Sequence, residues 1–293
     1  MSEQLPYLLA FGGTSFFAIA CIFFSIFAER FTSAWVNTLK TLVGCLGFLI
    51  VTTVFYEWNS ISVNSLLSFF VSGFAGLGVG DLFLVMAFTR IGAARTLMVF
   101  GFSPLFTGIQ GYLFFNQGIS VDKLSAIICL MMCLFVFSYE GYKKNGSWEI
   151  KGVIFALLGV LLDAIGIGIT RFGFEASVAV SSIEANFYRA LGALCFFMIY
   201  NYFKPVKLIT NLRVLTGKEK FTIITAGFAG TFLSLWMWNT AIKYGHLAIV
   251  SAIGVTGPFL ATIFECIYYK KLPNRYMLVA TAFFILGLYI LLA

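Results

Sequence analysis

Charged side chains are scarce in this sequence. Only 11% of its 293 residues are charged, 60% are hydrophobic, and histidine occurs once. Soluble domains carry about 25% charged residues, and a chain of this size buries only about three quarters of its unfolded surface. A soluble fold could not hide this much hydrocarbon, and disorder would need more charges and fewer aromatic residues. The composition therefore predicts an integral membrane protein.

Polar stretches long enough for a soluble domain are also missing. A membrane-spanning helix needs about 20 apolar residues. Ten such stretches follow one another along the chain, at about residues 6–27, 33–56, 65–89, 94–115, 121–139, 151–173, 181–203, 221–243, 246–268 and 275–292. Strands of a membrane barrel would alternate polar and apolar side chains, and these stretches do not. We expect an all-α protein with ten transmembrane helices surrounded by membrane lipid.

Motifs that hold a metal ion or a nucleotide are missing as well. The six cysteines lie inside the apolar stretches without a histidine cluster beside them, so we expect packing roles and no metal site. No phosphate-binding glycine-rich motif occurs, which excludes ATP-driven pumping by this chain alone. We expect no cofactor, no enzymatic activity and no nucleic-acid partner, since the net charge of +7 speaks to membrane topology.

The basic residues are distributed unevenly between alternate loops. Lys123, Arg171 and Lys243 fall in loops on one face of the predicted helices, and Lys40 and Arg189 fall within spans. The remaining 14 of the 19 lysines and arginines fall in loops on the other face. The positive-inside rule places that basic face in the cytoplasm, and both chain termini outside.

The chain also contains an internal repeat. The matched features are residues 73–76 with 227–230, Ala87 with Ala241, Pro104 with Pro258, and the pattern Asn37-x-x-Lys40 with Asn186-x-x-Arg189. The halves are residues 1–142 and 148–293, with five helices each. Because five is odd, the second copy is inverted in the membrane. Many secondary transporters have this architecture, with a substrate site near the midplane between the halves.

These residues carry a family resemblance. The chain resembles the EamA branch of the drug/metabolite transporter superfamily. The resemblance rests on the pattern Ala241-Ile-Lys-Tyr-Gly-His with Ser251, Gly257-Pro258-Phe259 and the basic turn Lys270-Lys271. Its first-half counterpart is Ala87-Phe-Thr-Arg with Ser103-Pro104-Leu105. The family's usual acidic residue after the fourth and ninth helices is absent: Asn116-Gln117 and Lys270-Lys271 stand there.

The resemblance covers nearly the whole chain and has functional implications. It implies an exporter of small organic metabolites, amino acids included, in the bacterial cytoplasmic membrane, with protons as a candidate coupling partner for antiport. An importer or exchanger on the same fold is the alternative. The resemblance also implies cytoplasmic termini, which contradicts the distribution of basic residues.

Ionisable side chains inside the spans are the main site candidates, because a charge in the bilayer core costs at least about 2.5–3.5 kcal/mol. They are Lys40, Asp81, Asp163, Glu184, Arg189 and Glu265. Counting depth at about 1.5 Å per residue pairs Lys40 with Asp81, and Arg189 with Asp163 or Glu184. Such pairs either fix helix packing or line a central cavity that binds a zwitterionic substrate or relays protons.

Asp163 is the favoured candidate for coupling. Asp163-Ala-Ile-Gly166, followed by Arg171, resembles the first helix of small multidrug resistance proteins, in which an acid carries the proton or the cationic substrate. A carboxyl group in apolar surroundings can alternate between its protonated and ionised forms, whereas permanent contact with Arg189 would keep it ionised.

Three other patterns each have two interpretations. Gly78-Val-Gly80-Asp81 with a second membrane aspartate is typical of intramembrane aspartyl proteases, but further protease elements are missing. The alternative is that Gly73, Gly76 and Gly80 form a stripe of small residues for close helix packing. Trp236, Trp238 and Asn239 form either a substrate pocket or ordinary packing and an aromatic belt. Pro104 and Pro258 either open the helical ladder toward a cavity or are simple kinks.

Overall fold

The computed structural model describes residues 4–55, 58–103, 149–177, 179–244, 253–254, 256–270 and 272–292, together with scattered residues between 106 and 143. Every element in these parts of the chain is helical. Pro104 and the expected repeat boundaries at residues 142 and 148 lie outside the described residues.

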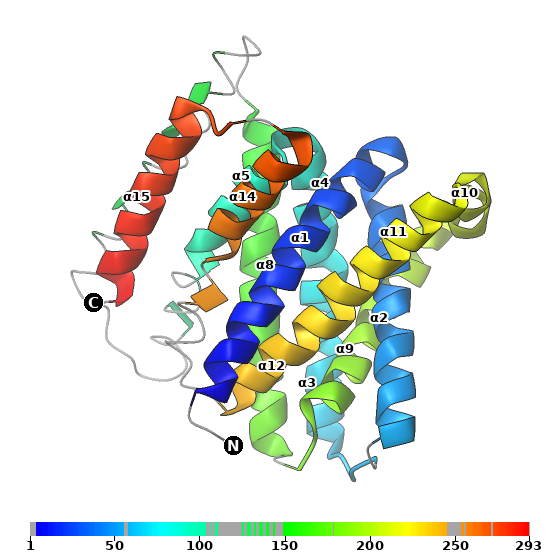
Figure 1. Cartoon of the computed structure of the whole chain (residues 1–293). Helices are drawn as coiled ribbons and strands as arrows, with labels where there is room; N and C mark the ends of the chain where they lie inside the picture. The colour runs from blue at the N-terminus through cyan, green and yellow to red at the C-terminus, as the bar shows by residue number, and fades with distance from the viewer. Residues whose placement is uncertain are drawn as a thin grey trace.

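The described part of the first half contributes three long spans and the start of a fourth, which Figure 1 shows at the blue end of the colour bar. They are α1 (Leu5–Arg30), α2 (Ser33–Phe55), a third span made of α3 (Val63–Ser72), η1 (Gly73–Gly80) and α4 (Asp81–Ile91), and α5 (Ala93–Val99) continuing into η2 (Phe100–Phe102). The η1 segment is a π-helix. Such segments are rare and often occur at functional sites.

The second half contains the counterparts of these helices. They are α8 (Ile150–Ala176), α9 (Ser182–Phe203), a short α10 (Leu208–Val214), a long span made of α11 (Gly217–Gly227), η3 (Phe228–Leu233) and α12 (Ser234–Tyr244), then α14 (Gly257–Tyr269) and α15 (Arg275–Leu292). The η3 segment is also a π-helix, so a π-helical segment recurs where residues 73–76 match residues 227–230. Five of the described spans are long and apolar enough to cross a membrane.

The two halves pack as inverted copies. Helix α1 runs antiparallel to the α11–η3–α12 span, from the contact of Ala10 with Ala241 to that of Arg30 with Glu219 (Figure 1). Helix α8 runs antiparallel to the α3–η1–α4 span in the same way. A Cβ on Gly152, near its start, would meet Ile91, and one on Gly173, near its end, would meet Phe69. Because α1 and the third span are separated by one span, α2, they run in the same direction. Helix α8 is antiparallel to the third span and therefore crosses the membrane in the direction opposite to α1.

One end of the bundle carries most of the described basic residues, and we call it the basic face. The helix ends there bear Arg30, Arg90, Lys151, Lys204, Lys218, Lys270 and Arg275. Arg171 and Lys243 lie at the opposite face. The uneven distribution expected from the sequence is thus present in the fold for the described residues.

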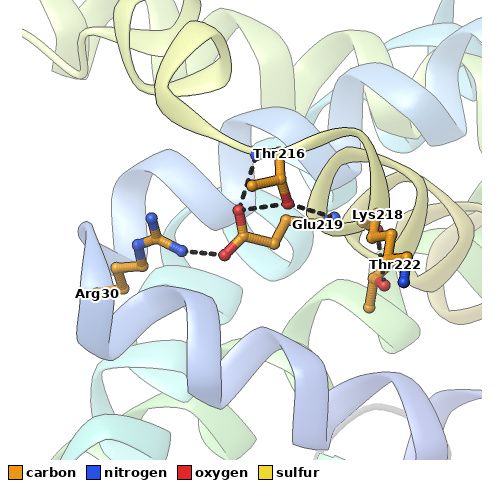
Figure 2. Close-up of polar contacts among 5 residues, drawn as sticks. All are labelled: Arg30, Thr216, Lys218, Glu219 and Thr222. Carbon is orange, nitrogen blue, oxygen red and sulfur yellow. Dashed lines mark hydrogen bonds and ion pairs between the residues drawn. The ribbon is translucent and has the colours of Figure 1, made fainter.

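Matched hydroxyl residues start equivalent helices. Ser62 caps α3 by accepting a hydrogen bond from the Ser65 backbone N–H, and Thr216 caps α11 by accepting one from that of Glu219. Figure 2 shows that the Glu219 carboxylate turns back to Thr216 and also binds Arg30 at the end of α1. This capping box ties the first helix of one repeat to the third of the other.

Glycines bring the central helices into backbone contact. A Cβ on Gly73 would lie 1.8 Å from the backbone oxygen of Arg189, and one on Gly192 would lie 2.0 Å from that of Phe70. No side chain larger than hydrogen fits at these two positions without a shift of the backbone. The interpretation of the glycine pattern as a helix-packing surface is confirmed for this seam between α9 and the third span.

Candidate functional site

Lys40 and Asp81 form a buried ion pair between α2 and α4. Lys40 Nζ lies 2.6 Å from Asp81 Oδ2, and the Lys40 side chain is only 2% exposed. The Nζ atom also lies 5.2 Å from the centre of the Phe24 ring, within the range of a cation–π contact. Depth counting along the helices predicted this pair, and it is confirmed.

Two asparagines make the same hydrogen bond in the two repeats. Asn37 Nδ2 donates to the backbone oxygen of Asp81 over 3.0 Å, and Asn186 Nδ2 donates to that of Leu235 over 3.1 Å. Residues 81 and 235 are therefore structurally matched. The side chain beside the first repeat's cation is a carboxylate, and its counterpart in the second repeat is an isobutyl group.

Arg189 is buried in a neutral network. Its Nε donates to Ser72 Oγ over 3.1 Å, and its Nη1 donates to Asn186 Oδ1 over 3.3 Å. Asn186 Oδ1 also accepts a hydrogen bond of 2.6 Å from Asn239 Nδ2. Arg189 is 2% exposed, yet no carboxylate of the described residues lies within the 4.0 Å of an ion pair.

Glu184, one of the two acids expected beside Arg189, binds a different neighbour. Glu184 is fully buried, and its Oε2 accepts a hydrogen bond of 3.0 Å from Asn59, in the connection between α2 and α3. Glu184 precedes Arg189 by five residues, which places it about 140° around the helix at 3.6 residues per turn. The two side chains therefore point to different neighbours.

Asp163 lies in the seam between α8 and the π-helical η1. A Cβ on Gly80 would lie 3.4 Å from the backbone nitrogen of Asp163, and one on Gly76 would lie 3.8 Å from its Cα. The carboxyl group is within electrostatic reach of Lys40, Asp81 and Arg189. It makes no hydrogen bond or ion pair with the part of the chain that the structure describes. It thus lies within the electrostatic field of both buried cations and forms an ion pair with neither.

The three residues expected to form an aromatic pocket, Trp236, Trp238 and Asn239, contact three different sets of neighbours. Trp236 packs with the cluster around Phe48 and Ile183, and Trp238 packs with the cluster around Ala10 and Ala241. Residues two apart on a helix point about 200° from each other, which explains the divergence. Asn239 alone joins the polar network, through Asn186.

Pro258 lies in the first turn of α14, which Thr256 precedes as the N-cap residue. Its missing N–H leaves no broken bond there, because the first N–H groups of a helix have no intrahelical partner. Thr262 Oγ1 donates to the Pro258 carbonyl over 2.9 Å. In the described part of the chain, Pro258 begins a helix.

The alternative of an aspartyl protease gains no support from this geometry. The Asp81 carboxylate is bound by Lys40, whereas a catalytic pair of aspartates needs both carboxylates directed at one water. Among the described residues, no cluster of histidine, cysteine, aspartate or glutamate could hold a metal ion.

Sequence reasoning missed two members of the polar network. In the sequence Asn186 stands out only as part of a repeated motif, and its recurrence with Asn37 indicates an equivalent structural role. Ser72 donates to the backbone oxygen of Gly166 over 2.8 Å while accepting from Arg189. A serine preceding a glycine-rich stretch has no sequence pattern that would single it out.

Comparisons with known proteins agree with this architecture. A family model described as the EamA-like transporter family matches residues 4–139 and 150–293. No curated protein matches the sequence. A solved chain, described only as a crystal structure of a protein, is similar over 99% of this chain and 96% of its own length, with a TM-score of 0.68 and 14% identity. At that identity the likeness shows the fold alone. The expected all-α membrane fold of two inverted five-helix repeats is confirmed.

Proposed function

Because the chain belongs to the EamA-like transporter family, which makes it a multi-pass membrane transporter of small solutes, we propose that it exports small organic metabolites such as amino acids. The export is driven by protons through alternating access, in the cytoplasmic membrane of a bacterium. An importer or exchanger on the same fold would use the same central groups in a different direction.

The position of Asp163 carries this proposal. A carboxyl group that lies within the field of two buried cations but is bonded to neither can exchange a proton without first breaking an ion pair. In its ionised form it attracts the ammonium group of an amino acid, and in its protonated form it does not. Proton and substrate would therefore compete for one carboxyl group, which is the simplest basis of antiport.

Alternating access requires that contacts between the two groups of helices open and close. On the basic face, Ser25 Oγ of α1 donates to the backbone oxygen of Phe88 in α4 over 3.2 Å. Close by, Glu265 Oε2 of α14 accepts a hydrogen bond of 3.3 Å from the backbone N–H of Ala94 in α5. The first bond joins two helices of the first repeat, and the second joins helices of opposite repeats. The bond between Glu265 and Ala94 would have to break if α5 and α14 separated to open a path toward the basic face.

The purified full-length protein in liposomes tests this function. Vesicles containing a labelled amino-acid mixture are given a pH gradient of either sign, and efflux and uptake are compared with those of protein-free vesicles. Solute movement against its own gradient, driven by an opposing proton gradient, supports proton antiport. Solute movement unaffected by the pH gradient overturns proton coupling, and the absence of any solute movement overturns the transport function.

A further inference from the structure

Of the two buried cations Lys40 and Arg189, only Lys40 forms an ion pair with a carboxylate of the described residues. Lys40 and Arg189 occupy matched positions in the repeats, and Asn37 and Asn186 bind matched carbonyls beside them. Lys40 has the carboxylate of Asp81 at 2.6 Å. The position equivalent to Asp81 is Leu235. The second repeat thus keeps the cation and the asparagine but lacks the built-in acid.

Arg189 still has hydrogen-bonding capacity that the described residues do not use. A guanidinium group has five N–H donors, and the described residues accept from only two of them, both with neutral oxygens. The three remaining donors lie on the Nη edge, which is the edge that binds a carboxylate in two parallel hydrogen bonds. A buried charge without such a partner is costly, so a ligand that supplies one gains that energy on binding.

Asp163 does not serve as the missing partner. Its carboxyl group makes no ion pair with Arg189 in the described structure, and its field is shared with Lys40 and Asp81. The hydrogen-bond partners of Arg189 among the described residues are neutral: Ser72, and Asn186 with its own donor Asn239. The site therefore presents one cation with open donors on α9 and one separate acid on α8, two helices that both pack against η1.

We propose that Arg189 binds the carboxylate of the transported solute, in the place that Asp81 takes beside Lys40. This inference rests on the proposed transport function and narrows its substrate class to small organic acids. An amino acid would place its carboxylate on Arg189 and direct its ammonium group toward Asp163. A neutral amide of the same size lacks the charge that Arg189 requires.

Pairs of acids and amides test this substrate class. The detergent-purified full chain is heated with each of the twenty amino acids, lactate and succinate, and separately with the corresponding amides, and the shift in Tm is recorded. At least one acid is expected to raise the Tm and to bind at least about tenfold more tightly than its amide, since a lost charge-assisted bidentate bond has an effect of that size. Equal binding of acid and amide overturns the inference.

A carboxylate supplied by the protein provides the sharper test. Leu235→Asp would place an acid at the position matching Asp81 and is expected to abolish the acid-induced Tm shift, while the protein folds as well as wild type. Leu235→Asn is the matched control, similar in size but uncharged, and is expected to keep that shift. Arg189→Lys is expected to retain part of the binding and Arg189→Gln none. A Leu235→Asp variant that binds acids as well as wild type overturns the inference.

The two proposals fail in distinguishable ways. If the liposomes move a neutral or cationic solute and transport is unaffected by Leu235→Asp, the carboxylate site is wrong and the transport function stands. If no solute moves in any liposome assay and no acid shifts the Tm, the transport function fails and the inference fails with it.

Discussion

Asn37 and Asn186 donate the same side-chain hydrogen bond in opposite halves of the molecule, to the backbone carbonyls of Asp81 and Leu235. Each bond ties the second helix of its repeat to the span that contains a π-helical segment. The backbone frame of the two repeats is thus preserved at the centre. The difference between them lies in the side chains, where the acid of one repeat is replaced by leucine in the other.

The ion pair of Lys40 and Asp81 is expected to stabilise the protein only as a pair. Removing one partner leaves a buried charge and costs about 3–5 kcal/mol, whereas removing both need not. We therefore expect Lys40→Met to lower the Tm of the detergent-purified protein strongly, and Lys40→Met with Asp81→Asn to restore most of it. Lys218→Met, at an exposed lysine, serves as the control. Equal damage from the single and double changes would show that the contact does not stabilise the fold.

The repeat, the membrane fold and this ion pair could be predicted from the sequence because each depends on position along the chain. Matched features at fixed spacing reveal the repeat, and depth in the membrane follows from the rise per residue. Both charges of the Lys40–Asp81 pair lie at similar depth on the sides of their helices that face each other. Counting residues along each helix was therefore sufficient to predict this pair.

Direction around the helix was the information that the sequence did not supply. Glu184 lies at a suitable depth for Arg189 but points elsewhere and binds Asn59. Trp236 and Trp238 are close in sequence but pack in separate clusters. Which face of each helix meets which neighbour depends on contacts such as Gly73 against Arg189, between segments far apart in the chain.

Glycine at position 73 is expected to be required for the seam between η1 and α9. A Cβ there would lie 1.8 Å from the backbone oxygen of Arg189, so Gly73→Ala must displace one helix. Overpacking of this kind costs about 1–3 kcal/mol. Gly76→Ala is the matched control in the same segment, because its Cβ would lie at an ordinary contact distance of 3.6 Å from Gly166 Cα. Thermal unfolding should show a lower Tm for Gly73→Ala alone, and equal Tm values for the two variants would contradict the seam.

The N-cap of α11 is expected to contribute more stability than the ion pair attached to it. Loss of a threonine cap costs about 1 kcal/mol, so Thr216→Ala should lower the Tm measurably. Ser62→Ala at the matched cap of α3 should have a similar effect. Arg30→Gln should have a smaller effect, which disappears at high salt, because the side chains of Arg30 and Glu219 are 45% and 32% exposed. A larger loss from Arg30→Gln than from Thr216→Ala would reverse this ranking.

The orientation in the membrane is expected to follow the basic face. Helix α15 starts on that face at Arg275 and runs to the opposite one (Figure 1), and basic loops are retained in the cytoplasm. A phosphatase reporter that is active only outside the cytoplasm should therefore be active when fused after Ala293. The same reporter fused after Asn211, in α10 on the basic face, should be inactive. The reverse pattern would show that the termini are cytoplasmic, as the family resemblance implies.

Asp163 is expected to couple transport to protons. It lies in an apolar stretch of α8, packed against η1 and within the field of Lys40, Asp81 and Arg189, without a bonded partner among the described residues. Because helix packing alone gives no reason to place a carboxyl group there, a functional cycle must offset its cost. Asp163→Asn keeps the shape of the side chain but cannot take up or release a proton. The variant should reach the membrane with a Tm close to that of the wild type and lose transport driven by a pH gradient. Counterflow exchange of solute across the same vesicles should persist, since it needs no net proton movement.

If the Asn variant still accumulates solute against its gradient under a proton gradient, coupling does not depend on Asp163. The neighbouring cation at Arg189 would then be the reason for the carboxyl group at this position.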